Sequence, residues 1–174
     1  MLYLLACYGI HLLGGISIQS LHMKTMALFF HGRVMRDMER LAEEFFDLHF
    51  LKMGNEPLLD FLKSRQKEGK FVAILSSSPD FLVEAVAKRL GVHDVLATRY
   101  EINSDGVIQG LSNSVQGKDK ADYVRSLPFD SHEIAAFSDS IHDLPFLQVV
   151  GCPIAVNPDR KLRAASIKNG WPIL

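Results

Sequence analysis

The stretch that decides the fold is FVAILSSSPDFLVEAVAKRLG, residues 71–91. It begins with an uninterrupted apolar run, which is typical of a parallel strand buried on both faces. Serines and Pro79 follow, and apolar residues then recur at helical spacing until Gly91, a residue type that commonly ends helices. We interpret this order as strand, loop and helix, which is the repeating unit of an α/β domain.

The same alternation continues toward the C-terminus. The pattern predicts strands at 95–98, 133–137 and 153–156, a hairpin at 100–108, and helices at 118–127, 144–149 and 159–167. A sheet whose strands alternate with helices is mostly parallel, and its ligands bind at the carboxyl ends of the strands. Residues 54–174 are therefore expected to form an α/β core with a mostly parallel sheet.

Residues 1–53 have a different character. No formal charge precedes Lys24, and the apolar residues after it recur at helical spacing. The uncharged stretch Met1–Met23 is as long as a membrane span, but polar residues and a glycine pair interrupt it. A signal peptide would also carry a basic residue before the apolar run. We expect packed helices over residues 1–53, with membrane association as an alternative.

The composition limits the classes of function. The chain has 174 residues, of which 48% are hydrophobic and 22% charged, as expected for a globular protein with a core. Its formal net charge of -1 provides no basic surface for a nucleic-acid backbone, so we expect no nucleic-acid partner. Cys7 and Cys152 form neither a disulfide framework nor a CxxC metal site, which is typical of a reducing, cytoplasmic compartment.

Two polar clusters stand next to predicted helix starts. Ser76-Ser77-Ser78 follows the strand over 71–75, where hydroxyl and backbone N–H groups can hold a phosphate. The alternative is that Ser78 only caps the next helix. Gly117-Lys118-Asp119-Lys120 opens a later helix, and Lys118 opposes the helix dipole there. That placement fits a nearby anion, although an ordinary surface lysine also explains it.

A third cluster is SDSIHDLP, residues 138–145. Asp139 and Asp143 lie four residues apart, directly after a predicted buried strand. Carboxylate oxygens in this arrangement suit Mg²⁺, which prefers hard oxygen ligands. A pair of aspartates at this spacing is common by itself. Here it follows a strand, and it is the third polar cluster of the chain to do so, which makes the combination of the three clusters a more specific signal.

The three clusters together resemble motifs II, III and IV of the haloacid dehalogenase superfamily. The similarity is to subfamily IB, the phosphoserine-phosphatase-like hydrolases, and the endings AVNPD at 155–159 and GWPIL at 170–174 also resemble that subfamily. The resemblance covers about Leu58–Leu174 well and Met1–Met53 loosely. It implies a Rossmann-like core with a helical cap inserted after the first strand.

The resemblance also implies a chemistry. In such enzymes an aspartate attacks the phosphorus of a small phosphorylated metabolite, and water hydrolyses the aspartyl-phosphate. Ser76, with Ser77, would bind the phosphoryl group, and Lys118 would neutralise its developing charge. Asp139 would bind Mg²⁺, and Asp143 would orient Lys118 or a metal-bound water. These roles agree with the need of phosphoryl transfer for positioning and positive charge. His142 stands where the family more often has Asn.

Motif I of that family, DxDx[TV], is absent from the sequence. It would supply the nucleophile and the general acid/base. Residues 2–9, LYLLACYG, resemble its strand, but Ala6 and Tyr8 stand where the aspartates belong. We therefore expect a chain that is truncated within the cap, lacks the first core strand, and is inactive as given. The alternatives are a degenerate module that binds phosphate or Mg²⁺ without turnover, and a membrane-associated module using Met1–Met23.

Overall fold

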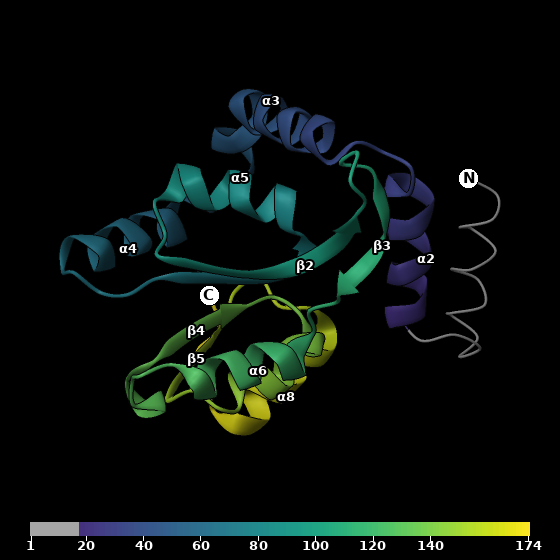
Figure 1. The fold of residues 1–174 in the computed structure, drawn as a ribbon. Coiled ribbons are helices and arrows are strands. Elements are labelled where there is room, and N and C mark those ends of the chain that lie inside the picture. The colour runs from purple at the N-terminus through teal and green to yellow at the C-terminus, as the bar shows by residue number, and fades with distance from the viewer. Residues whose placement is uncertain (1–17) are drawn as a thin grey trace.

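The computed structural model describes residues 18–174 (Figure 1). It begins with two helices, α2 over Ile18–Phe30 and α3 over Met35–Met53. The helical pattern after Lys24 gave no position for a break, and the chain turns between the two helices, where Gly32 has a φ of 78°. Residues 2–9, which resemble the strand of motif I, lie outside the described residues.

Hydrogen bonds to a distant hairpin fix this turn. Gly32 N–H donates to the carbonyl of Ile108 at 2.9 Å, and Met35 N–H donates to the carbonyl of Gly106 at 2.9 Å. Val34 forms an isolated bridge with Val107. Periodicity alone missed the break because its cause is tertiary.

The next elements confirm the predicted strand and helix, but the serines and Pro79, expected in a loop, belong to the strand, and the helix follows it directly. Helix α4 spans Glu56–Lys67, strand β1 spans Ala73–Pro79 and helix α5 spans Asp80–Leu90. Asn55 caps α4 by accepting from Leu58 N–H at 3.2 Å, and Gly91 ends α5 with a φ of 63°. Both ends follow the capping preferences of these residue types.

The second and third strands form the predicted hairpin. Strand β2, Asp94–Ile102, pairs parallel to β1, and β3, Ile108–Asn113, pairs antiparallel to β2. Asn103 shapes the turn, since its side-chain oxygen accepts from Asp105 N–H at 3.0 Å and from Val107 N–H at 2.9 Å. These strands form a sheet in the order β1-β2-β3.

The C-terminal part contains a second sheet. Its elements are helix α6 (Gly117–Ser126), strand β4 (Ala135–Ser138), the short helix α7 (Leu144–Leu147), strand β5 (Cys152–Ala155) and helix α8 (Arg160–Asn169), with single 3₁₀ turns over Ser131–Glu133 and Ile141–Asp143. Strands β4 and β5 are parallel. On its other side, β5 forms a parallel bridge between Ala155 and Ile173.

The described strands therefore form two sheets where the sequence predicted one. Strands β1 and β4 are each an edge, and no pairing joins them among residues 18–174. The α/β class is confirmed, but the three-stranded sheet is mixed because β3 runs antiparallel. Figure 1 shows β4 and β5 with α6 and α8 on one side of the molecule, and β1–β3 with α3 and α5 on the other.

Each part has its own buried core. One cluster contains Phe146, Leu147 and Leu162 under β4 and β5, and Leu75 of β1 packs against it. The other joins Met35 and Ala42 of α3 to residues of α5 and β2 such as Phe81. Helix α3 therefore lies directly on α5. The division of the chain at residues 53 and 54 remains a prediction.

Within residues 18–174, no helix is both long enough and apolar enough to cross a membrane. Most of the stretch Met1–Met23, on which the membrane alternative depended, lies outside the described residues.

Candidate active site

The carboxyl end of β4 carries a buried ion pair. Lys120 Nζ lies 2.7 Å from Asp143 Oδ1, with only 7% of the lysine side chain and 13% of the aspartate side chain exposed. Ser138, the last residue of β4, donates its hydroxyl to Asp143 Oδ2 at 2.8 Å. Both oxygens of Asp143 are thus engaged. Burial of two charges is tolerated only with such close compensation.

Helix α6 reaches this pair because its first residue has no side chain. A Cβ on Gly117 would overlap the carbonyl oxygen of His142 and would lie 3.2 Å from Pro145 Cδ. The helix start can therefore approach the loop after β4 closely. This approach places Lys120, one turn into the helix, over Asp143.

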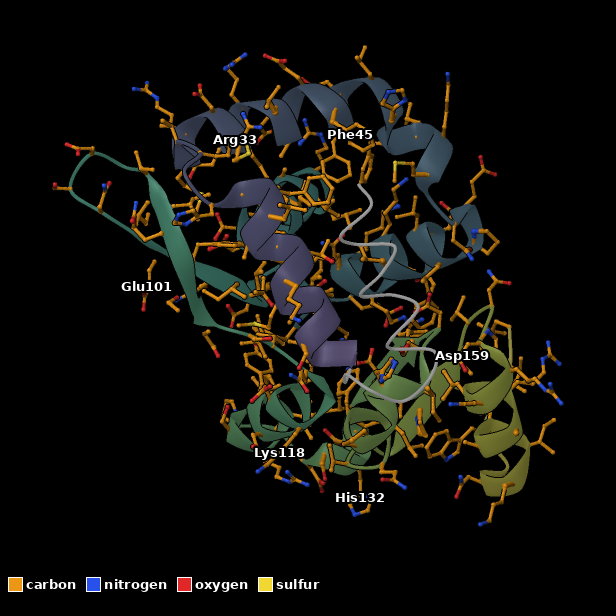
Figure 2. All side chains as sticks on the ribbon, turned by 90° about the vertical axis from the view of Figure 1, so that its right-hand side faces the viewer. Arg33, Phe45, Glu101, Lys118, His132 and Asp159 are labelled. Carbon is orange, nitrogen blue, oxygen red and sulfur yellow. The ribbon has the colours of Figure 1, made fainter. Side chains whose placement is uncertain are left out.

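Lys118 lies elsewhere. Residues two apart on a helix point to nearly opposite faces, so Lys118 is exposed while Lys120 is buried, with 5% of its surface accessible. Figure 2 shows Lys118 at the outer edge of α6. The resemblance led us to expect Asp143 beside Lys118, and the structure corrects that pairing: the lysine bonded to Asp143 is Lys120.

Ser76 and Ser77 were predicted to follow the strand, and they lie in the second half of β1, just after its regular pairing with β2 ends at Leu75. Ser76 Oγ accepts from Ser78 N–H at 3.1 Å, which leaves its own hydroxyl proton free to donate to a ligand. The Ser77 carbonyl accepts from the buried hydroxyl of Thr98 at 2.9 Å, and Thr98 Oγ1 accepts from Val115 N–H at 3.1 Å. Ser77 thereby ties the end of β1 to the segment that leads into α6.

Asp139 and its neighbour Asp159 form the other side of the loop after β4. The Asp139 side chain is exposed, and its carbonyl accepts from Asp159 N–H at 2.7 Å. The Asp159 carboxylate accepts from Ile141 N–H at 2.7 Å and from Lys161 and Leu162 N–H at 2.8 Å. Burial alone would raise the pKa of Asp159, but these N–H donors outweigh it and hold the pKa below its ordinary value.

The fit of this site to Mg²⁺ rests on Asp139. Asp139 offers an exposed carboxylate of the right chemistry, whereas the two oxygens of Asp143 already bond to Lys120 and Ser138. Among the described residues, no group of three or more His, Cys, Asp or Glu side chains gathers to hold a metal. Mg²⁺ often binds through one or two carboxylates, with waters and substrate phosphate completing its shell.

Sequence reasoning missed Lys120, Ser138 and Asp159 as site residues. A signal for Lys120 was present, since it stands two residues after Lys118 in the same cluster. Lys120 turns inward because it lies on the same buried face of α6 as Gly117, Ala121 and Val124. Asp159 was expected only at the start of the last helix. It caps that helix, and its second oxygen also accepts from Ile141 N–H.

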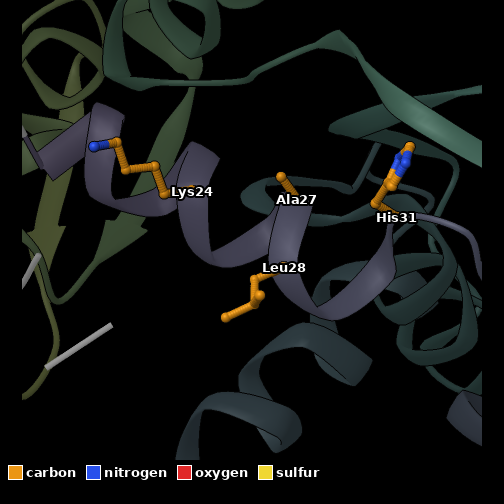
Figure 3. Close-up of a pocket in the computed structure, with 4 residues that line it drawn as sticks. All are labelled: Lys24, Ala27, Leu28 and His31. Carbon is orange, nitrogen blue, oxygen red and sulfur yellow. The ribbon is translucent and has the colours of Figure 1, made fainter. Parts of the chain in front are cut away.

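A separate pocket lies along α2. It has a volume of about 310 Å³ and is lined by Lys24, Ala27, Leu28 and His31, as Figure 3 shows. His31 Nδ1 is within hydrogen-bond distance of the Gln109 carbonyl at 2.9 Å, which ties α2 to β3. None of the strand-end residues above lines this pocket.

Comparison with known proteins identifies the family. The model of haloacid dehalogenase-like hydrolases matches residues 2–148. The chain belongs to the haloacid dehalogenase-like hydrolases. Within that family the chain is similar to the phosphoserine-phosphatase-like members, as the sequence predicted.

Individual relatives agree with this family. The "Inhibition of morphological differentiation protein" of Streptomyces azureus is 38% identical over 65% of this chain and 43% of its own length. "Phosphoserine phosphatase SerB1" of Mycobacterium tuberculosis (strain ATCC 25618 / H37Rv) is 30% identical over 83% of this chain and 49% of its own. The chain thus spans about half the length of these relatives.

A solved structure supports the fold. The "Phospho-Aspartyl Intermediate Analogue of Phosphoserine phosphatase" superposes with a TM-score of 0.66 at 14% identity, over 98% of this chain and 78% of that chain. At that identity the likeness shows the fold alone.

Proposed function

We propose that this chain carries a phosphomonoester-binding site of the family's phosphatase type, which holds the phosphate of a small phosphorylated metabolite together with Mg²⁺. The observation that carries the proposal is the buried Lys120–Asp143 pair at the end of β4. A buried ammonium fixed by one carboxylate oxygen retains N–H groups that can be directed at an anion.

Each site residue has a role that follows from its position. The hydroxyl of Ser76 donates to a phosphate oxygen, and Lys120 places positive charge beside the same group. Asp143 and Ser138 act as positioning residues, because Asp143 accepts from Lys120 and Ser138 donates to Asp143. Asp139 is the residue that would hold Mg²⁺, which neutralises charge on phosphate oxygens when bound.

We propose further that the chain binds without turnover. Phosphoryl transfer needs a nucleophile in line with the leaving group. The aspartate that the family resemblance implies for this task, within DxDx[TV], does not occur in the 174 residues. Purified chain is therefore expected to show no Mg²⁺-dependent hydrolysis of p-nitrophenyl phosphate or phosphoserine. With the residues that it contains, the chain would therefore act as a module that binds phosphate and Mg²⁺ without turnover.

The test is calorimetric titration of the full chain with inorganic phosphate in the presence and absence of Mg²⁺. We expect saturable binding that Mg²⁺ strengthens. Lys120→Met should weaken it about tenfold or more, because a hydrogen bond to a charged group is worth roughly 1.5–3 kcal/mol. Lys118→Met is the matched control and should leave binding unchanged.

Two further variants keep the test decisive if Lys120→Met does not fold. Ser76→Ala should weaken phosphate binding, and Asp139→Asn should remove the Mg²⁺ effect while leaving the fold intact, since Asp139 is exposed. Absence of phosphate binding by the folded wild-type chain would overturn the proposal. So would a loss of binding in Lys118→Met with full binding in Lys120→Met.

A further inference from the structure

The outer face of helix α8 carries positive charge and no negative charge. Leu162 and Ser166 are fully buried and define the inner face of the helix, which belongs to the core under β4 and β5. Residues on the opposite side of a helix then face the solvent. The exposed residues there, here called the α8 outer face, are Arg160, Lys161, Arg163, Ala164, Ile167 and Lys168.

Helical spacing arranges the α8 outer face in two adjacent rows, because residues three and four apart are neighbours on a helix. One row is Arg160, Arg163 and Ile167, and the other is Lys161, Ala164 and Lys168. Each row therefore combines two cations with one apolar residue. Ile167 is 68% exposed, so most of its apolar side chain lies in water between these cations.

The charges of the α8 outer face are uncompensated. Within residues 18–174, none of its four cations has a carboxylate at ion-pair distance. The sequence after Asp143 contains a single acidic residue, Asp159. The Asp159 carboxylate is engaged by the backbone N–H groups of Ile141, Lys161 and Leu162. The face thus stays positive in a chain whose formal net charge is -1.

Both ends of α8 are fixed to the rest of the protein. Asp159 caps its first turn, and after its last residue Trp171 N–H donates to the Ser166 carbonyl at 2.9 Å. Trp171 also packs against the core cluster that contains Leu162. Figure 1 shows α8, in yellow, at the end of the molecule opposite to α3. The α8 outer face is therefore presented to the outside by a helix of fixed position.

We propose that the α8 outer face binds the surface of a lipid bilayer that contains anionic phospholipids. The four cations meet the negatively charged headgroups, and Ile167 enters the apolar layer beneath them. Long Lys and Arg side chains can reach the headgroups while a neighbouring apolar side chain lies deeper. This surface is separate from the stretch Met1–Met23, and the proposal does not depend on phosphate or metal binding at the strand ends.

Shape and the exposed isoleucine favour a bilayer over other anionic partners. The exposed side of a helix is convex, so it touches a broad surface along its length and offers no groove to a second chain. An acidic polypeptide or a nucleic acid would satisfy the cations but would leave Ile167 without an apolar partner. A bilayer satisfies both, because its charged layer covers an apolar one.

The test is co-sedimentation of the full chain with vesicles. One set contains equal parts of phosphatidylserine and phosphatidylcholine, and the other contains phosphatidylcholine alone. We expect binding to the first set only, and loss of binding as salt is added, because salt shortens the Debye length. Arg163→Gln combined with Lys168→Gln should weaken binding about 25-fold, because each basic residue near an anionic leaflet contributes a factor of about five.

A second pair of exposed lysines provides the matched control. Lys63→Gln combined with Lys67→Gln in α4 removes the same charge from another helix and should leave vesicle binding unchanged. Ile167→Ser keeps every charge and should still weaken vesicle binding severalfold, because it removes the inserted apolar group. Neither change in α8 should alter the phosphate titration, which tests the strand-end site separately.

Three results would overturn the proposal. The first is no binding to the phosphatidylserine vesicles, or equal binding to vesicles of phosphatidylcholine alone. The second is an equal loss of binding in the α8 and α4 double variants, which would reduce the effect to net charge. The third is equal vesicle binding by wild-type chain and Ile167→Ser together with competition by polyglutamate or duplex DNA, which would make the partner a polyanion rather than a bilayer.

Discussion

The ammonium of Lys120 and the carboxylate of Asp143 form a buried pair with a separation of 2.7 Å. The pair joins the first turn of α6 to the loop after β4. It thereby connects two of the three polar clusters, residues 117–120 and residues 138–145. Because both groups are largely withdrawn from water, each depends on the other for compensation.

Loss of Lys120 is expected to destabilise the fold. Removing one partner of a buried pair leaves an uncompensated charge and costs about 3–5 kcal/mol in typical cases. Lys120→Met should therefore lower the free energy of unfolding by roughly that amount in urea titration, whereas Lys118→Met on the exposed face should change it by less than about 0.5 kcal/mol. Equal stability of the two variants would contradict the assignment of Lys120 to the buried position.

A double variant separates burial from pairing. Lys120→Met combined with Asp143→Leu removes both charges, and such replacements are often neutral or stabilising. The double variant should be more stable than Lys120→Met alone. If the two changes simply add, the residues do not interact as a pair.

Gly117 is expected to tolerate no side chain. Gly117→Ala forces a Cβ against the carbonyl of His142, which is backbone and cannot rotate away. Overpacking of this kind costs about 1–3 kcal/mol, and the displaced helix should also weaken phosphate binding by Lys120. Gly110→Ala is the control, because its Cβ would lie 3.9 Å from the flexible Glu101 side chain. Thermal unfolding and phosphate titration measure both effects.

Asp159 is expected to stabilise the C-terminal part in a pH-dependent way. Its pKa is held below the ordinary value of 3.8 by N–H donors, so its contribution is complete above that pH and is lost as the pH falls through the lowered pKa. Asp159→Ala should cost about 1–2 kcal/mol at neutral pH, as for a helix N-cap. Urea titrations of both proteins at several pH values should show this difference shrinking in acid. A difference that grows in acid would contradict the sign.

Arg89 is expected to hold α3 against α5. Its guanidinium pairs with Glu43 and Asp47 of α3, and it also donates to the Glu43 carbonyl at 2.9 Å. Lysine cannot reproduce this forked set of bonds. Arg89→Lys should therefore speed amide exchange in α3. Lys88→Ala removes only an exposed ion pair with the same Glu43, at 3.3 Å, and should change the exchange much less. Unaltered exchange in Arg89→Lys would show that the apolar contacts alone hold α3.

Sequence reasoning located the elements well where the cause was local. The strand at 71–75, the helix ending at Gly91 and the Asp159 cap all depend on nearby residues, and all occur in the structure with small shifts of boundary. It failed at Gly32, where hydrogen bonds from a hairpin far along the chain break the helix. Local pattern carries no information about such a partner.

The site was predictable to the level of clusters but not of individual side chains. Ser76 and Asp139 could be placed at strand ends from the apolar runs before them. The choice between Lys118 and Lys120 required the packed face of α6 to be known, which contains Lys120 with Ala121 and Val124. The division into two sheets depends on strand pairing across the whole chain, which periodicity does not contain.

The most direct measurement is the position of tungstate, a heavy-atom analogue of phosphate, in crystals of the full chain grown with Mg²⁺. We predict an anomalous tungsten peak within hydrogen-bond distance of Ser76 Oγ and Lys120 Nζ. A peak beside Lys118 on the outer face of α6, with none between the ends of β1 and β4, would contradict the proposed site.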